Sequence, residues 1–391
     1  MGTTSRFTGV DFYHFDRNFS DEERSVRETV RRFVDDRFLP DIKQHFREGT
    51  FPLELAAEMG QLGLLGPAVK GPGCPGLSYT LYGLMCQELE RGDSGLRSFA
   101  SVQGSLVMWP IATYGSQEQQ ERWLPELAAG TKIGCFGLTE PDHGSDPGGM
   151  KTFARRDGDD WILNGTKLWI TNANTADVAV VWARCDEGVI GFLVERGMEG
   201  FSTNPVHGKF SLRASDTGEL VFDDVRLPES SRLPRAKGLK APLSCLNEAR
   251  YGIAWGVVGA AMDCYDTALR YAREREQFGK PIASFQLVQQ KLVTMLTEIT
   301  KAQGLVLQLG RLKDDGINEV PLTSLSKRNN VAMALDCARV ARDILGAAGV
   351  TDEFSPGRHM ANLESVITYE GTHDIHTLIV GAEITGLPAF R

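Results

Sequence analysis

The chain has 391 residues, of which 42% are hydrophobic and 24% are charged, and its net charge is −9. This length and composition predict a globular protein of two or three domains. The acidic balance argues against a nucleic-acid partner, and no apolar run is long enough to span a membrane. The seven cysteines are scattered and lack metal-ligand spacing, which predicts free thiols and no metal site. The N-terminal stretch lacks the apolar core of a signal peptide, so we expect a cytoplasmic protein.

Residues 1–133 are predicted to form an N-terminal helical domain. Ser20 stands before an acidic turn, DEER, and predicts the start of a helix that continues to Phe38. Two longer apolar helices are expected over 79–91 and 95–114.

Residues 134–236 are predicted to form a central β-domain, either a barrel or a sandwich. Between 151 and 228, short alternating apolar runs are separated by turn residues, a pattern typical of successive antiparallel strands. The pair Asn164-Gly165 is expected to form one of these turns.

Residues 237–391 are predicted to form a C-terminal helical bundle. Long helices are expected over 243–274, 284–313 and 321–345, since each range combines apolar residues at helical spacing with a polar face. Helices flanking a separate β-domain place the whole chain in the α+β class.

The first candidate site is Tyr369-Glu370-Gly371-Thr372, which lies between two predicted helices. Glycine followed by threonine predicts that one helix ends here and that Thr372 caps the next. A glutamate at such a bend, among apolar neighbours, would have a raised pKa and could take a proton from carbon near neutral pH. On the segment alone, an exposed glutamate beside a helix cap is the commoner arrangement.

Three further stretches have the composition of ligand contacts. The connection 134–149 is rich in glycine, so its N–H groups, with Thr139 and Ser145, could cradle a phosphate. The segment 169–172 places an indole beside a hydroxyl, and Arg275 at a helix end could contact an anion. An interdomain loop, a core tryptophan and a plain helix end are the alternatives. No GxGxxG follows a strand, so a Rossmann site is not indicated.

These stretches also occur together, in order, in one known family. The chain resembles the acyl-CoA dehydrogenases over nearly its whole length. Within that family it is most similar to the glutaryl-CoA dehydrogenases, on RGDSGLRSFASVQGSLVM, GCFGLTEP and its final stretch. The motifs that carry the family resemblance are LTEPDHGSDPGGM (138–150), TKLWITNA (166–173), REREQFGKPIASFQ (273–286) and TYEGTHDIH (368–376).

The resemblance implies an N-terminal helical domain, a central β-barrel-like domain and a C-terminal four-helix bundle, usually assembled as a homotetramer. It also implies that FAD lies between the β-domain and the bundle. The residues implied for FAD within one subunit are Phe136, Leu138, Thr139, Ser145, Trp169, Thr171, Thr372 and Asp374. Those implied for the FAD of a neighbouring subunit are Arg275, Phe278 and Gln286.

For the substrate, the resemblance implies that Glu370 is the catalytic base and that Arg97 holds the distal carboxylate of a glutaryl group. The further residues implied for the acyl-CoA are Ser98, Glu90, Val102, Ser145, Arg250 and Tyr369. The implied reaction oxidises glutaryl-CoA, releases CO2 and crotonyl-CoA, and passes electrons to an electron-transfer flavoprotein.

Four alternatives remain at this stage. Leu96 stands where many decarboxylating relatives have tyrosine, so one is a glutaryl-CoA dehydrogenase that stops before decarboxylation. The second is a dehydrogenase of another short acyl-CoA, and the third is an oxidase. The fourth belongs to a different class, a flavin-free scaffold that binds acyl-CoA.

Overall fold

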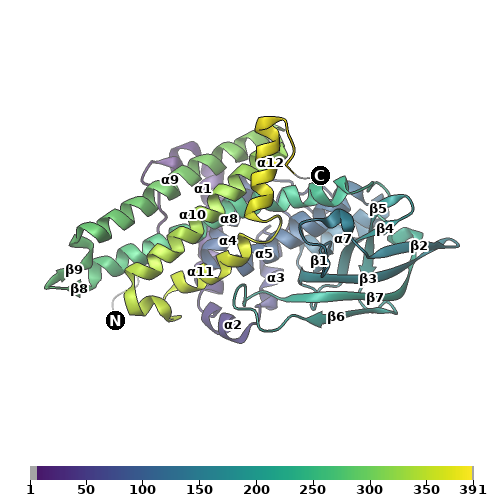
Figure 1. Ribbon diagram of the computed structural model, residues 1–391, viewed down its shortest axis with the longest axis horizontal. Helices are drawn as coiled ribbons and strands as arrows, with labels where there is room; N and C mark the ends of the chain where they lie inside the picture. Colours follow the sequence, from purple (N-terminus) through teal and green to yellow (C-terminus); the bar gives the residue numbers. More distant parts are fainter. Residues whose placement is uncertain (1–6, 390–391) are drawn as a thin grey trace.

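The computed structural model describes residues 7–389 and combines a helical body with one β-sheet. Figure 1 shows the sheet at one end, with the N-terminal and C-terminal helices packed together beside it. This architecture confirms the predicted α+β class and the sequence of helical, β and helical regions.

The N-terminal helices follow the predicted pattern, with two changes. The helix expected to continue to Phe38 is α-helical only to Phe33, and a π-helical segment, Val34–Phe38, follows it. A capping box starts the first helix: Glu23 N donates to Ser20 Oγ, and Ser20 N donates to Glu23 Oε2. The single helix expected over 95–114 is instead two α-helices joined by a π-helical segment, Val102–Met108. The helices are α1 (Asp21–Phe33), α2 (Ile42–Glu48), α3 (Ala56–Gln61), α4 (Tyr79–Gly92), α5 (Ser94–Ser101), α6 (Trp109–Tyr114) and α7 (Gln117–Ala128).

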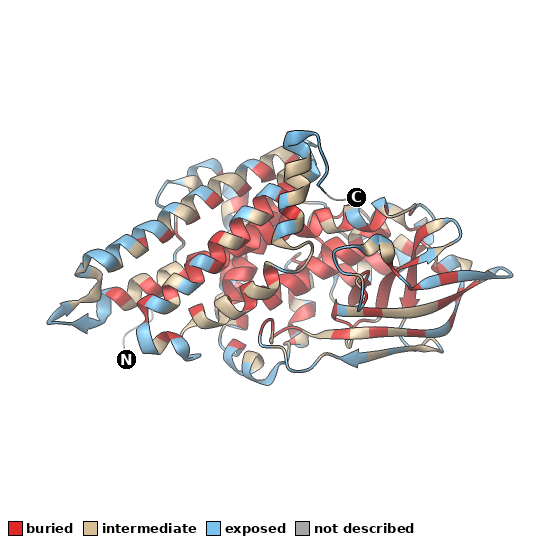
Figure 2. Cartoon of the chain, viewed as in Figure 1, coloured by how far each residue is buried: buried red, intermediate tan, exposed pale blue. Residues whose placement is uncertain are grey.

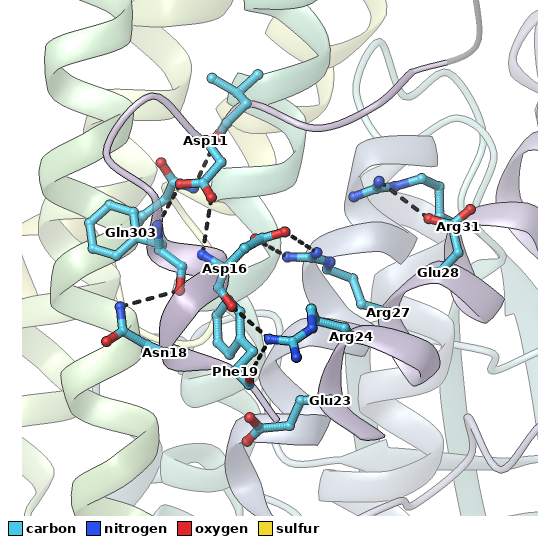
Figure 3. Close-up of polar contacts among 12 residues, drawn as sticks. Asp11, Asp16, Asn18, Phe19, Glu23, Arg24, Arg27, Glu28, Arg31 and Gln303 are labelled. Atoms are coloured by element: carbon cyan, nitrogen blue, oxygen red, sulfur yellow. Dashed lines mark hydrogen bonds and ion pairs between the residues drawn. The ribbon is translucent and has the colours of Figure 1, made fainter. Parts of the chain in front are cut away.

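The segment that precedes α1 is tied to the rest of the protein by polar contacts (Figure 3). Arg27 binds both carboxylate oxygens of Asp16 at 2.7 Å. Gln303, on the C-terminal helix α9 (Gln286–Asp314), donates to the carbonyl of Val10 at 3.0 Å. The segment before α1 is therefore joined to the C-terminal helices through α9.

The sheet has the order β1-β4-β2-β3-β7-β6, with β5 paired to β4. The strand pairs β1–β4 and β2–β4 are parallel, and the other pairs in this sheet are antiparallel. The strands are β1 (Gly134–Gly137), β2 (Phe153–Asp157), β3 (Asp160–Thr171), β4 (Val178–Cys185), β5 (Gly188–Glu195), β6 (Phe201–Pro205) and β7 (Thr217–Pro228).

The turn expected at Asn164-Gly165 is wrong. Both residues lie inside β3, where the pairing with β7 shifts register between Leu163 and Gly165. Gly165 has φ +140°, and a Cβ there would lie 2.5 Å from Thr152 Oγ1. The glycine therefore marks a bulge with a close neighbour, and not a hairpin.

The C-terminal helices pack around α10, which contacts α8, α9, α11 and α12. At Gly259 a Cβ would lie only 1.8 Å from the carbonyl oxygen of Gln87, so α8 and α4 approach with their backbones in contact. The elements after α7 and the sheet are α8 (Lys240–Glu274), the hairpin β8 (Glu276–Gln277) and β9 (Lys280–Pro281), α9, α10 (Val320–Ile344), α11 (Ser355–Val366) and α12 (His373–Thr385).

Burial is greatest where the three regions meet. Figure 2 shows the buried residues concentrated on the central helices and the inner part of the sheet, while the β8–β9 hairpin is exposed. Arg97 and Lys327 belong to this buried centre, which marks it as a place where polar groups need specific partners. None of the helices described here combines the length and apolarity needed to cross a membrane.

Candidate active site

The bend between α11 and α12 has the backbone geometry that its sequence predicts. Thr372 caps α12, since its hydroxyl accepts a hydrogen bond from Ile375 N at 3.2 Å. Gly371 has φ +92° and Glu370 has φ +52°. A left-handed conformation at a glutamate costs about 1–3 kcal/mol and persists only where the surroundings enforce it.

Two cations from neighbouring helices hold this bend through its backbone carbonyls. Arg250 of α8 donates from Nε to the Glu370 carbonyl at 2.8 Å. Lys327 of α10 donates from Nζ to the carbonyls of Tyr369 and Gly371 at 2.5 and 2.6 Å. The residues on both sides of Glu370 are thus fixed, and its side chain remains free of these contacts.

The Glu370 carboxylate is shielded from solvent, and nearby positive charges offset only part of the cost of its burial. Its Oε2 is buried without a hydrogen-bond partner among the described residues. Burial raises the pKa of Glu370, while the charges of Arg97, Lys327 and Arg250 act in the opposite direction, and the net shift is upward. A carboxyl group with a raised pKa is a stronger base when ionised, as proton abstraction requires.

Arg97 lies beside this bend and is completely buried with Glu90. The Arg97 Nε atom is 2.7 Å from Glu90 Oε2, and both side chains have no exposed surface. Arg97 Nη2 also donates to the Tyr369 hydroxyl. At Gly256 of α8 a Cβ would lie 2.1 Å from Glu90 Oε2, so the glycine makes room for the carboxylate. Arg97 Nη1 has no partner within residues 7–389, which leaves one donor for a ligand.

The other predicted substrate residues surround this cluster in different ways. Ser98 follows Arg97 in α5 and is buried, and Val102 is buried at the start of the π-helical segment. π-helical turns are frequent at functional sites. Ser145, in contrast, is exposed in the loop after β1.

Trp169, near the end of β3, has the geometry of a ligand platform. Its side chain is 59% exposed and its φ is +65°. The loop after β1 lies next to it, because Leu168 N donates to the Thr139 carbonyl at 2.9 Å. Thr139 and Thr171 are partly exposed. A core position for the indole, the alternative from sequence, is therefore wrong. Phe136, in β1, and Leu138, at the start of the same loop, are buried.

That loop is anchored by a buried pair that the sequence analysis missed. Lys167 of β3 donates to Glu140 Oε1 at 2.9 Å and to the Leu138 carbonyl at 3.1 Å. Burial alone would raise the pKa of Glu140, but hydrogen bonds from Lys151 N and Lys167 lower it to about 2. The pair fixes the loop backbone close to Trp169.

The remaining predicted residues are not part of this cluster. Arg275 and Gln286 are exposed, and Phe278 is 93% exposed with φ +54°. They lie at or beside the β8–β9 hairpin, at the opposite end of the molecule from the sheet (Figure 1). Asp374 is exposed in the first turn of α12.

Models of one family match the three regions in chain order. The acyl-CoA dehydrogenase N-terminal domain matches residues 20–131, the middle domain matches 135–225 and the C-terminal domain matches 236–385. The chain belongs to the acyl-CoA dehydrogenase family.

Relatives within the acyl-CoA dehydrogenase family align over almost the whole chain. The mitochondrial short-chain specific acyl-CoA dehydrogenase of Homo sapiens is 35% identical over 91% of this chain and 88% of its own. A crystal structure of glutaryl-CoA dehydrogenase from Mycobacterium smegmatis is 57% identical, with a TM-score of 0.97 over 98% of this chain and 100% of its own. A second crystal structure shows a glutaryl-CoA dehydrogenase from M. smegmatis in complex with FADH2. It is 55% identical, with a TM-score of 0.97 over 98% of this chain and 99% of its own.

Lys327 belongs to the buried cluster around Glu370, and the sequence analysis did not identify it. It is 1% exposed. The predicted helix over 321–345 contains a pattern that indicates burial of this lysine. Lys327 falls at helical spacing with apolar residues that are buried in α10. These are Val331, Ala334, Ala338 and Ala341. A lysine on such an apolar face needs buried acceptors.

Proposed function

We propose that the protein oxidises a short dicarboxylic acyl-CoA, glutaryl-CoA, and decarboxylates it to crotonyl-CoA and CO2, with FAD as cofactor. The observation that carries this proposal is the unpaired, buried Nη1 of Arg97 close to the shielded carboxyl group of Glu370. A base and a separate cation in one buried region match the two ends of a dicarboxylic acyl thioester.

The residues around Trp169 fit a flavin. An exposed indole on a left-handed backbone, beside partly exposed hydroxyls of Thr139 and Thr171, offers a flat surface with polar donors at its edge. Phe136, Leu138, Thr139, Ser145, Trp169 and Thr171 are proposed to hold FAD in one subunit, together with Thr372 and Asp374. When bound, FAD accepts a hydride from the β-carbon of the substrate.

Glu370 is proposed to remove the α-proton of the thioester. Its Oε2 is free to accept this proton. The backbone N–H of Glu370 is proposed to polarise the thioester carbonyl, which lowers the cost of the enolate. In its protonated form Glu370 can return a proton after CO2 has left, so the same carboxyl group serves both steps.

Arg97 is proposed to bind the distal carboxylate. Glu90 occupies Nε and Tyr369 occupies Nη2, so Nη1 remains for an incoming carboxylate. A purely apolar acyl chain would leave that donor unsatisfied, which costs about 1–3 kcal/mol or more for a charged group. The higher identity to the glutaryl-CoA dehydrogenase (57%) than to the short-chain relative (35%) agrees with this choice.

The proposal also covers the assembly and the electron acceptor. We place the domain boundaries at 133/134, between α7 and β1, and at 236/237, between β7 and α8. Arg275, Phe278 and Gln286, on or next to the exposed hairpin, are proposed to reach the FAD of a neighbouring subunit in a homotetramer. Electrons are proposed to pass to an electron-transfer flavoprotein, and the location is proposed to be cytoplasmic.

A substrate panel tests the proposal. Purified protein is assayed with glutaryl-CoA and butyryl-CoA and an artificial electron acceptor, and CO2 and crotonyl-CoA are quantified. We expect a preference for glutaryl-CoA and one CO2 for each crotonyl-CoA. Arg97→Met should lower kcat/KM for glutaryl-CoA by roughly 30-fold or more, from a loss of 2–5 kcal/mol, and should affect butyryl-CoA much less.

Five results would contradict parts of this proposal. Preference for butyryl-CoA, or equal losses on both substrates, would remove Arg97 from carboxylate recognition. Glutaconyl-CoA as the final product would leave oxidation without decarboxylation. Colourless protein that takes up no FAD would indicate an acyl-CoA-binding scaffold. Rapid turnover with air alone would indicate an oxidase.

A further inference from the structure

We propose that Lys327 is a positioning residue for the base. Its ammonium group links the two backbone carbonyls that flank Glu370, and so holds the bend that aims the carboxyl group. This inference rests on the proposed role of Glu370, and it assigns to Lys327 a function that acts through that residue.

The geometry gives Lys327 two acceptors and no acidic partner. Its Nζ donates to the carbonyls of Tyr369 and Gly371 at 2.5 and 2.6 Å. No carboxylate of residues 7–389 lies within ion-pair distance of it, whereas the equally buried Lys313 pairs with Glu248 at 3.0 Å. A buried cation needs compensation, and for Lys327 it comes from the backbone of the bend.

The bend needs this support because its backbone is strained. Glu370 has φ +52°, which a non-glycine residue adopts only under constraint. Arg250 holds the Glu370 carbonyl itself, and Lys327 holds those of the preceding and following residues. Three consecutive carbonyls are therefore directed at cations from α8 and α10, which fixes the backbone from which the Glu370 side chain projects.

The charges around Lys327 couple it to the base. Arg97 of α5, Arg250 of α8 and Glu370 are the charged groups that act on it. Burial lowers the pKa of Lys327 to about 7; Glu370 opposes this shift, while Arg250 and Arg97 add to it. From α12, His376 contributes no charge near neutral pH, because burial, with the charges of Lys327 and Arg250, lowers its pKa to about 2.

Three further groups complete this environment. His373 of α12 also has a lowered pKa, first because of burial and then because of Arg328, the residue after Lys327 in α10. Tyr369 is neutral, since burial raises the pKa of its hydroxyl. An ionised Glu370 therefore favours a protonated Lys327, and loss of that cation would raise the pKa of Glu370 further.

Two substitutions separate the hydrogen bonds from the charge. Lys327→Met removes both, and Lys327→Gln keeps an N–H donor without the charge. Lys313→Met is the matched control, since it removes a buried lysine that pairs with Glu248 away from the bend. FAD content, unfolding temperature, kcat, KM and the pH profile of kcat/KM are measured for each purified holoenzyme, with Glu370→Gln as reference.

We expect Lys327→Met to lower kcat on the order of 10²-fold, because a displacement of about 1 Å at the reacting atoms has this effect. Its KM and FAD content should change little. Lys327→Gln should recover part of kcat. Both variants should move the acid limb of the pH profile to higher pH, which a merely structural role would not do. Lys313→Met should lower the unfolding temperature and leave kcat per bound FAD unchanged.

The outcomes distinguish this inference from the proposed function. If Glu370→Gln retains full turnover, the proposed base is wrong. If Glu370→Gln is inactive but Lys327→Met has the kcat and pH profile of the parent enzyme, the positioning role is overturned. The same holds if Lys327→Met and Lys313→Met lose kcat equally, or if Lys327→Met loses activity only in proportion to lost FAD.

Discussion

Arg97 and Glu90 form an ion pair in which neither side chain reaches solvent, with Arg97 Nε 2.7 Å from Glu90 Oε2. Each partner also has one buried polar atom without a hydrogen bond among the described residues, Arg97 Nη1 and Glu90 Oε1. The pair therefore leaves one donor and one acceptor buried without a hydrogen bond in the part of the chain that the structure describes. This arrangement makes the cluster sensitive to the loss of either partner.

Glu90→Ala should lower the free energy of unfolding by about 3–5 kcal/mol, because it leaves the Arg97 guanidinium buried without its counter-charge. Denaturant titration measures this change. Glu58→Ala is the control, since Glu58 pairs with Arg37 in an exposed position and such pairs contribute about 0–1 kcal/mol. Similar losses for the two variants would show that Arg97 does not depend on Glu90.

The reaction should fail at acidic pH through Glu370. Burial raises the pKa of this carboxyl group above its usual value, so below that pKa it is protonated and cannot accept the α-proton. The value of kcat/KM should therefore rise with pH through the raised pKa. Glu370→Gln should abolish dehydrogenation and leave FAD bound, as its absorbance would show. An acid limb that persists in a still active Glu370→Gln variant would assign it to another group.

Gly371→Ala should lower both stability and turnover. Gly371 has φ +92°, and a Cβ would lie 3.0 Å from His376 Nε2 and 3.2 Å from Arg250 Nη2. We expect a loss of about 1–3 kcal/mol in unfolding free energy, together with reduced kcat as the bend shifts. Thermal unfolding and steady-state kinetics measure the two effects.

Gly381→Ala is the matched control for that prediction. Gly381 lies inside α12, and a Cβ there would meet no atom of the described structure within 4 Å. Alanine in a helix interior should stabilise the protein by about 0.5–1 kcal/mol. If both glycine variants behave alike, the conformation of the bend is not what limits activity.

Trp169→Ala should weaken the retention of FAD. The indole is 59% exposed beside Thr139 and Thr171, and alanine keeps the same backbone demand at φ +65°. The flavin absorbance per chain after gel filtration measures retention. Phe210→Ala removes an exposed ring of 71% exposure in the β6–β7 connection, and it should keep its FAD. Equal flavin content in all three proteins would remove Trp169 from the cofactor site.

Local signals in the sequence were sufficient for most elements and for the bend. Ser20 and Thr372 cap helices as expected, since an N-cap depends on a few adjacent residues. The bulge at Gly165 was not predictable in this way. The close neighbour of Gly165 is Thr152, which lies just before β2 and is distant in sequence, and the dipeptide Asn164-Gly165 has the local chemistry of a turn.

In the candidate site, too, the contacts between residues distant in sequence could not be predicted from local patterns. The neighbours of Glu370 in sequence made it a candidate, but its role as base, like the role of Arg97, was implied by the resemblance to a family. That the two share one buried cluster with Glu90 depends on the close approach of α4 and α8. The position of Lys327 on an apolar helix face marks it as buried, but its partners could not be predicted, because they are backbone carbonyls and carry no residue-type signal.

The carbonyls around Glu370 are held from α8 and α10, and the cation beside it comes from α5. A nascent chain that has not yet folded α10 and α12 onto the earlier helices therefore lacks the contacts that hold this bend, even when its β-sheet is complete. With Glu370 as the proposed base, we expect the recovery of enzymatic activity after dilution from denaturant to trail the recovery of secondary structure.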